Sequence, residues 1–85
     1  MYKFEFKNKA AQSLDKLPSQ IRNRILIKLK FYSSQNNPLD FAERLTDYEM
    51  GDWRFRVGDY RIIFDADGDK IIILKIGHRK DIYKC

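Results

Sequence analysis

The stretch Trp53-Arg54-Phe55-Arg56-Val57-Gly58-Asp59-Tyr60-Arg61-Ile62-Ile63-Phe64 decides the fold of this chain. Its first five residues alternate between apolar and basic side chains, which is the period of a β-strand that buries one face. Gly58-Asp59 is a two-residue turn signal, and the residues that follow it return as a second strand. The stretch therefore predicts an antiparallel hairpin.

The turn also fixes the register of this hairpin. A two-residue loop pairs Val57 with Tyr60 and Arg56 with Arg61, and cross-strand partners share a face of the sheet. One face is therefore apolar and lies against the core; it carries Trp53, Phe55, Val57, Tyr60, Ile62 and Phe64. The opposite face collects Arg54, Arg56 and Arg61.

Three guanidinium groups on neighbouring strands repel one another, so this face calls for an explanation. The arginines can bind an anion such as phosphate, for which the guanidinium fork is well suited. They can also pair with turn carboxylates such as Asp52, Asp59 or Asp65, or simply face solvent. The residues alone leave these alternatives open.

Upstream of the hairpin, Tyr2-Lys3-Phe4-Glu5-Phe6 alternates like a strand. Asn8 is a candidate cap for a short helix from Lys9 towards Lys16, which Leu17-Pro18-Ser19 interrupts. A second helix opens at Pro18 or Ser19 and ends within Ser33–Pro38. Its apolar stripe has helical spacing and consists of Ile21, Ile25, Leu29 and Tyr32.

Downstream, Asp67-Gly68 predicts a second tight turn, and Lys70–Ile76 predicts a central strand covered on both faces. Gly77 ends that strand, and residues 78–85 read as a polar tail. We expect a single α+β domain over residues 1–85. It has an N-terminal strand, a two-helix hairpin and a three- to four-stranded, mostly antiparallel meander, with the helices packed on one face.

The composition excludes several classes of protein, among them disulfide-bonded, zinc-binding and membrane-spanning ones. The chain has 85 residues, a net charge of +5 and one cysteine, which excludes an internal disulfide. Cys85 and His78 are too few to form a zinc site, so we expect no metal and no cofactor. The longest aliphatic run, Ile71–Leu74, is far shorter than a membrane span. Because Met1–Phe6 lacks the apolar core of a signal peptide, we expect a cytoplasmic protein without membrane contact.

The hairpin block, together with Ile73-Leu74-Lys75-Ile76-Gly77-His78-Arg79 and Ile82-Tyr83, closely resembles the RelE/ParE superfamily of toxins from prokaryotic toxin–antitoxin systems. The resemblance is collinear over nearly the whole chain and includes the Leu17-Pro18 break and Arg44-Leu45. It implies a small α+β toxin that a cognate antitoxin protein neutralises.

The resemblance implies one of two activities. Toxins of the RelE branch enter the ribosome and cut messenger RNA without a metal, through attack of a 2′-hydroxyl that leaves a 2′,3′-cyclic phosphate. Toxins of the ParE branch inhibit DNA gyrase without catalysis. We favour the RelE branch because Arg79 and Tyr83 match its C-terminal pattern. A catalytically weak RNA-binding member stays open as a further alternative.

The resemblance also assigns roles to residues of this chain. Arg54 and Arg56 match the two basic strand positions of the RelE site, and Arg61 matches the arginine that holds the scissile phosphate. Arg79 and Tyr83 match the late arginine and the tyrosine that stacks on or orients the nucleotide. His78 is a further catalytic candidate, and Arg44 and Lys80 are expected to contact RNA.

The general base stays open at this stage. Arginine holds its proton too firmly to serve, which leaves Tyr83, His78, a carboxylate such as Glu49, or no base at all. A second open point is the surface of the longer helix. Leu26, Ile27 and Phe31 are apolar residues outside its stripe, and an amphipathic antitoxin segment could cover them.

Overall fold

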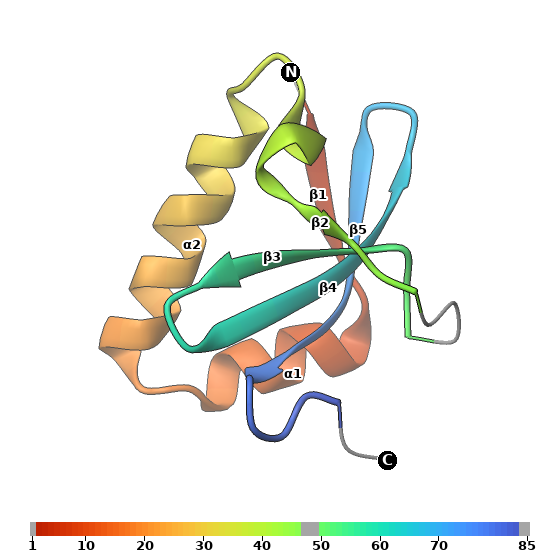
Figure 1. Ribbon diagram of the computed structural model, residues 1–85. Helices are drawn as coiled ribbons and strands as arrows, with labels where there is room; N and C mark the ends of the chain where they lie inside the picture. Colours follow the sequence, from red (N-terminus) through yellow and green to blue (C-terminus); the bar gives the residue numbers. More distant parts are fainter. Residues whose placement is uncertain (1, 47–49, 84–85) are drawn as a thin grey trace.

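The computed structural model describes residues 2–46 and 50–83, and it has the predicted α+β architecture (Figure 1). The elements in chain order are β1 Lys3–Phe6, α1 Asn8–Lys16, α2 Ser19–Ser33, the 3-10 helix η1 Pro38–Phe41, β2 Glu43–Arg44, β3 Trp53–Val57, β4 Tyr60–Asp67 and β5 Lys70–His78. The sheet has the order β1-β5-β4-β3-β2. β1 runs parallel to β5, and the other neighbouring strands are antiparallel.

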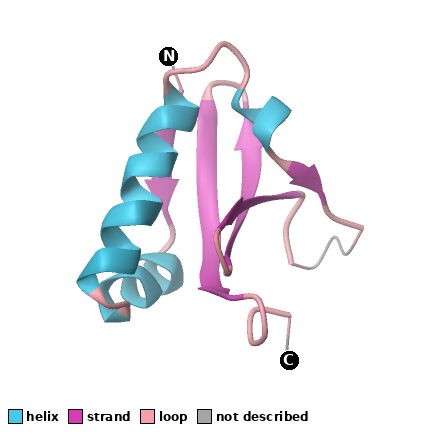
Figure 2. Cartoon of the chain, turned by 60° about the vertical axis from the view of Figure 1, so that its left-hand side comes forward, coloured by secondary structure: helices cyan, strands magenta, loops and turns pink. Residues whose placement is uncertain are grey.

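Both helices lie on one side of the sheet, as Figure 2 shows. α1 buries Ala10 and Leu14, and α2 buries Ile25, Leu29 and Tyr32, so the predicted apolar stripes face the core. The predicted cap of α1 is wrong. The helix begins at Asn8, Lys7 takes the cap position, and no side chain caps it, because packing against the sheet stabilises so short a helix more than its ends do.

The first hairpin has the predicted register, from Val57 opposite Tyr60 to Trp53 opposite Phe64. Gly58 has φ 59° and is the first central residue of the turn, a position that requires positive φ in a type II′ hairpin. The second turn differs from the prediction by one residue. Asp67 pairs with Lys70, so the turn residues are Gly68 and Asp69, and Gly68 again has positive φ.

An irregularity between β4 and β5 changes which side chains of β5 share a face. Phe64 pairs with Ile73, but Ile63 pairs with Lys75, so Leu74 is an extra residue in the ladder. This bulge lets Ile73 and Ile76 both face the helices although three positions separate them. The same shift places Lys75 beside Ile63, on the face away from the helices.

The core lies between the helices and the sheet and is organised around stacked rings. Phe55 stacks on Tyr32 and on Phe64, with ring centroids 4.3 Å apart in both pairs. Such offset pairs add to the free energy gained from burying the rings. The prediction that β5 is covered on both faces is only partly correct. Ile71 and Ile73 are buried, but Ile72 and Leu74 on the opposite face are only half-buried.

Two irregular segments cover parts of the face of the sheet away from the helices. One contains Gly51, and the other is the C-terminal segment, residues 79–83, which follows β5. Gly51 packs its backbone so closely on Ile63 that a Cβ would lie 2.7 Å from Ile63 Cγ2. The C-terminal segment is not the purely polar tail that its sequence suggests, because Ile82 is buried at 1% exposure. No helix within the described residues is long and apolar enough to cross a membrane.

Candidate functional site

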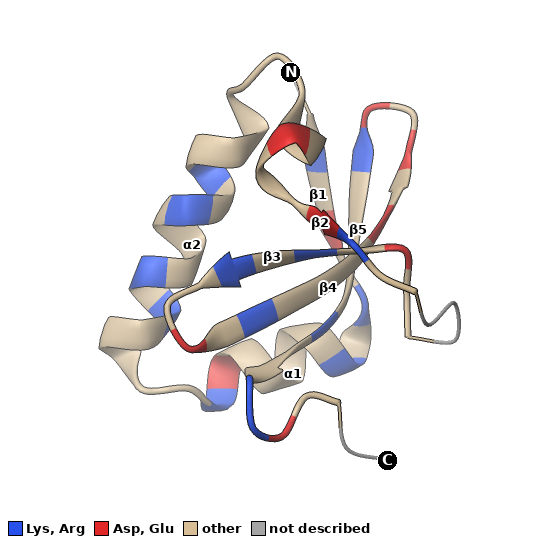
Figure 3. Ribbon diagram, in the orientation of Figure 1, with Lys and Arg blue, Asp and Glu red and all other residues tan. Residues whose placement is uncertain are grey.

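The strand arginines share one face of the sheet, away from the helices. Arg54 pairs with Ile63 and Arg56 pairs with Arg61, so their side chains project to the same side. Figure 3 shows basic residues on the adjacent strands β3 and β4, with acidic residues at the β3–β4 turn and on β2. We call Arg54, Arg56, Arg61 and Lys75 the basic face. It combines the arginine set predicted from the hairpin with one lysine.

Lys75 is a member of this face that the sequence analysis missed. A regular ladder would place Leu74 beside Ile63, and the bulge puts Lys75 there instead. Its Nζ donates a 2.9 Å hydrogen bond to the carbonyl oxygen of Ile82. The ammonium group thus adds a fourth positive charge to the face and anchors the C-terminal segment.

Glu43 is a second residue that the sequence analysis missed. It lies on the two-residue strand β2 opposite Arg54, and its carboxylate accepts from Arg54 Nη2 at 3.1 Å and from Arg56 Nη1 at 3.4 Å. The hydrogen bond from Arg54 is the main cause that lowers the pKa of Glu43 below its ordinary value. None of the three turn carboxylates considered as partners, Asp52, Asp59 and Asp65, is paired with Arg54 or Arg56. Asp65 instead accepts a hydrogen bond from the Asp52 backbone.

Arg61 differs from its neighbours because the backbone holds it. It is buried, with 7% exposure, and its Nη1 donates to the carbonyl oxygens of Gly58 and Tyr60, both at 3.0 Å. A freely solvated Arg61, one of the alternatives left open above, does not describe this side chain. Within residues 2–46 and 50–83, Arg61 has no carboxylate partner, and backbone carbonyls are its hydrogen-bond acceptors.

Tyr83 lies over the basic face and contacts Arg54. Arg54 Nη1 donates to the Tyr83 hydroxyl, and the guanidinium lies 5.8 Å from the centre of the ring. The hydrogen bond to Tyr83 is the main cause that raises the pKa of Arg54 above its ordinary value. Arg54 Nε is buried and has no hydrogen-bond partner in the described part of the chain.

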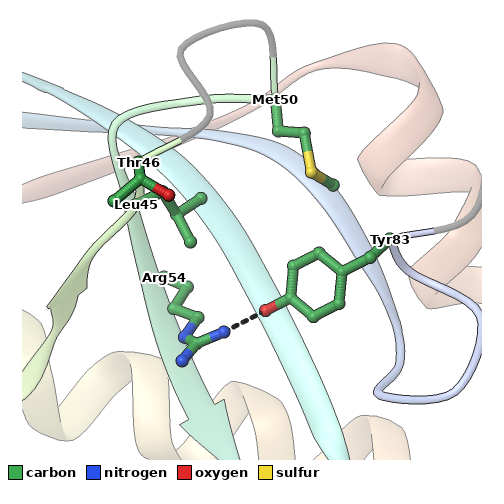
Figure 4. Close-up of a pocket in the computed structure, with 5 residues that line it drawn as sticks. All are labelled: Leu45, Thr46, Met50, Arg54 and Tyr83. Atoms are coloured by element: carbon green, nitrogen blue, oxygen red, sulfur yellow. Dashed lines mark hydrogen bonds between the residues drawn. The ribbon is translucent and has the colours of Figure 1, made fainter.

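A pocket of about 350 Å³ opens beside this contact. Figure 4 shows Arg54 and Tyr83 pointing towards each other at one side of it, with their hydrogen bond drawn as a dashed line. The remaining lining comes from Leu45, Thr46 and Met50. The pocket is therefore mainly apolar, with a cation and an aromatic ring at the edge that adjoins the basic face.

Arg79 contacts the turn at the end of the hairpin. Its backbone NH donates to the Asp59 carbonyl oxygen at 2.8 Å, and its Nε lies 3.7 Å from Asp59 Oδ1. Arg61 bonds to the same turn through Gly58. Arg79 therefore lies at the rim of the basic face, while Lys80 is exposed and its backbone NH donates to His78 Nδ1 at 3.1 Å.

Two candidate residues lie on the other face of the sheet. His78 pairs with Tyr60, and the two rings meet edge to face with their centroids 5.4 Å apart. Arg44 pairs with Trp53 and lies over that ring at 5.3 Å. Because Tyr60 and Trp53 pack against the core, the sheet separates both candidates from the basic face. The geometry therefore does not support His78 as a catalytic group.

Two residues from the sequence analysis, Glu49 and Cys85, lie outside the described residues. Among residues 2–46 and 50–83, no three His, Cys, Asp or Glu side chains cluster as metal ligands would. The guanidinium groups of the basic face are hydrogen-bond donors of the kind that phosphate oxygens accept. One carboxylate, one tyrosine hydroxyl and one ammonium group lie beside them.

Known proteins are similar to this chain in sequence. Residues 4–83 match the family described as the ParE toxin of the type II toxin–antitoxin system parDE. The chain is 33% identical over 75 residues to the RelE3 toxin of Methanocaldococcus jannaschii, covering 85% of this chain and 84% of that protein. It is 29% identical over 85 residues to the RelG toxin of Mycobacterium tuberculosis, covering 98% and 97%.

Solved structures of toxin–antitoxin complexes have the same fold. A RelBE2 complex from Mycobacterium tuberculosis contains a chain similar to this one with a TM-score of 0.74 and 28% identity, covering 92% of this chain and 98% of that one. A RelB–RelE complex from Methanococcus jannaschii gives 0.72 and 31%, covering 94% and 95%. Because the family match spans residues 4–83, nearly the whole chain, this protein belongs to the ParE toxin family of type II toxin–antitoxin systems.

Proposed function

We propose that the protein is a ribosome-dependent endoribonuclease that cuts messenger RNA in the cytoplasm and so inhibits translation. The observation that carries the proposal is the clustering of Arg54, Arg56 and Arg61 on the face of the sheet away from the helices, with the Tyr83 hydroxyl bonded to Arg54. The similarity to toxins named RelE3 and RelG supports the RelE branch.

The proposed reaction needs no metal. The 2′-hydroxyl of the RNA attacks the adjacent phosphorus, and the bond to the 5′-oxygen of the next nucleotide breaks, which leaves a 2′,3′-cyclic phosphate and a 5′-hydroxyl. Preorganised positive groups stabilise the charge that develops on the phosphorane. Arg61 suits this role because two backbone carbonyls fix it while its Nε and Nη2 make no hydrogen bond to the described residues.

Proton transfer needs a group that can gain or lose a proton near neutral pH. The arginines stay protonated. Glu43 is ionised at neutral pH, as any glutamate with a pKa at or below the ordinary value is, and the arginines lower its pKa further. Two proton transfers are needed: one from the attacking 2′-hydroxyl and one to the leaving 5′-oxygen. We assign them to Tyr83 and to groups of the ribosome-bound RNA, and we give His78 no part in them. With positioning and charge stabilisation as the main contributions, we expect a slow enzyme in the absence of ribosomes.

The antitoxin partner is part of the same proposal. Ile27 on α2 is 68% exposed, and Leu26, Phe31 and Phe41 are each exposed above 40%. Phe31 and Phe41 meet edge to face at 5.5 Å, which makes the apolar surface continuous from α2 to η1. We propose that a segment of the cognate antitoxin covers this surface, as a partner helix covers an apolar groove.

The direct test adds purified protein to translating ribosomes and maps message ends by primer extension. We expect cuts within codons at the ribosomal A site, and a loss of roughly 100- to 1000-fold in rate for Arg61→Ala, by analogy with removal of one transition-state donor. Arg22→Ala on α2 is the matched control and should retain the activity. Intact messages at all protein concentrations would refute the proposal.

Inhibition of DNA gyrase is the second candidate, and the observation that favours it is the match to a family described by its ParE toxin. A supercoiling assay run with the same preparation separates the two. Inhibited supercoiling together with uncut message would establish gyrase as the target.

A further inference from the structure

The carboxylate of Glu43 occupies the part of the basic face where an external anion would bind. One oxygen accepts from Arg54 Nη2 and the other from Arg56 Nη1, so the carboxylate spans two guanidinium groups on β3. A phosphate uses the same kind of donors through two of its non-bridging oxygens. Within the described residues, no other carboxylate contacts Arg54 or Arg56.

The contact is exposed enough to be displaced. The side chains of Glu43 and Arg56 are 45% and 59% exposed, and Arg54 is 27% exposed. Ion pairs in such surroundings are weak because water competes for both partners. Glu43 also lies on a strand of only two residues at the edge of the sheet, so its side chain can turn towards solvent without disturbing the core.

Arg61 provides the contrast within the same face. Its Nη1 is bonded to two carbonyl oxygens, and no carboxylate of the described chain contacts it. On the basic face, Arg54 and Arg56 therefore already share a carboxylate, whereas Arg61 has none among the described residues.

We propose that Glu43 is an internal competitor for phosphate. In the free protein its carboxylate occupies the Arg54–Arg56 site, and an RNA phosphate must displace it there, whereas Arg61 binds a phosphate without displacement. The inference rests on the proposed function, because it takes RNA as the ligand. It assigns Glu43 the effect of weakening RNA binding to the isolated toxin, so that productive binding depends on the ribosome presenting the message.

The opposite role for Glu43 is to hold the two arginines in the geometry that RNA requires. The two roles predict opposite signs for Glu43→Gln. Glutamine keeps the length of the side chain and can still accept from one arginine, but it has no negative charge and cannot accept through both terminal atoms. If Glu43 competes with RNA for the two arginines, Glu43→Gln should tighten RNA binding. If Glu43 holds the arginines in position, the same substitution should weaken RNA binding.

The experiment measures binding of a fluorescently labelled single-stranded RNA hexamer to the full chain without ribosomes, as a function of salt. Glu43→Gln should tighten the affinity about three- to tenfold at low salt. The log–log salt dependence should steepen by up to about 0.7, the value for one further phosphate contact on a single strand. Asp15→Asn, an exposed carboxylate on α1, removes the same charge from the other side of the sheet and should change the affinity less than twofold.

Each outcome bears on one proposal. Unchanged or weaker RNA binding by Glu43→Gln overturns the competitor role, provided Arg61→Ala weakens binding in the same assay. If Arg61→Ala has no effect on RNA binding and messages stay uncut, the proposed function itself fails. Thermal unfolding of each variant checks that the fold is intact, and an exposed ion pair is too weak for its loss to unfold the protein.

Discussion

The side chain of Ile82 packs on the backbone of Gly77, with Ile82 Cδ1 only 3.1 Å from where a Cβ at Gly77 would lie. The Ile82 backbone NH also donates to the His78 carbonyl oxygen at 2.9 Å. These contacts fold the chain back after β5 and carry the next residue, Tyr83, over Arg54. One buried apolar side chain therefore positions the tyrosine of the candidate site.

Ile82→Ala should loosen this arrangement. Removing a fully buried isoleucine side chain costs about 2–5 kcal/mol of unfolding free energy, and the variant should also lose cleavage because Tyr83 is no longer held. Urea denaturation and the ribosome assay measure the two effects. Tyr83→Phe is the control: it removes the exposed hydroxyl contact and should cost less than about 1 kcal/mol. Equal stabilities of the two variants would contradict the anchoring role of Ile82.

Gly51→Ala should destabilise the protein far more than Gly68→Ala. Gly51 has φ 145°, and a Cβ there would lie 2.7 Å from Ile63 Cγ2 and 3.0 Å from Leu74 Cδ1. Gly68 has φ 60° but open space around its Cβ position, so its cost is the left-handed backbone alone, about 1–2 kcal/mol. We expect a loss above about 2 kcal/mol for Gly51→Ala, measured by urea denaturation. Similar losses at both positions would show that the packing of Gly51 is unimportant.

The Glu43 carboxyl should titrate below the ordinary glutamate pKa of about 4.3. Because its pKa is lowered in the folded state, the stability it contributes is present above the ordinary pKa and disappears as the pH falls through the lowered value. The side-chain carboxyl carbon resonance, followed by NMR from pH 7 to pH 2, reports the titration. Arg54→Gln should return the pKa towards the ordinary value. A normal pKa in the unmodified protein would mean that the ion pairs do not form in solution.

Arg56→Gln should lower the rate of message cleavage while leaving the unfolding free energy nearly unchanged. Arg56 lies opposite Arg61, and like charges at that position are unfavourable, while its pair with Glu43 is exposed. We expect the unfolding free energy to change by less than about 0.5 kcal/mol and the rate of message cleavage to fall at least about tenfold, because one group that stabilises the transition-state charge is lost. Lys9→Gln on α1 removes one positive charge elsewhere and should leave cleavage unchanged. A stability loss as large as the activity loss would indicate a structural role instead.

The hairpin is the part of the fold that the sequence predicts in most detail. Alternation from Trp53 to Val57 and the Gly58 turn were enough to predict which residues are opposite one another, and the register is confirmed down to Phe64. The apolar stripe of α2 and the order of the elements were predictable for the same reason. Side-chain period and turn chemistry are local properties of the chain.

Parts of the candidate site could not be predicted in this way. Lys75 joins the basic face only because a bulge adds one residue to β5, and alternation read along the sequence places it on the opposite face. Glu43 belongs to a strand of two residues, too short for any periodic pattern. The separation of His78 and Arg44 from the basic face likewise depends on their pairing with Tyr60 and Trp53.

The sequence by itself therefore determined the α+β class, the hairpin and the shared face of Arg54, Arg56 and Arg61, because these follow from contacts between neighbours in the chain. Only the tertiary structure decided what surrounds those arginines. Glu43, Lys75 and Tyr83 come from β2, β5 and the C-terminal segment, and the distances among them depend on strand order, one bulge and the burial of Ile82. Such long-range packing has no local signature, although it sets the charge and the shape that an RNA phosphate would encounter.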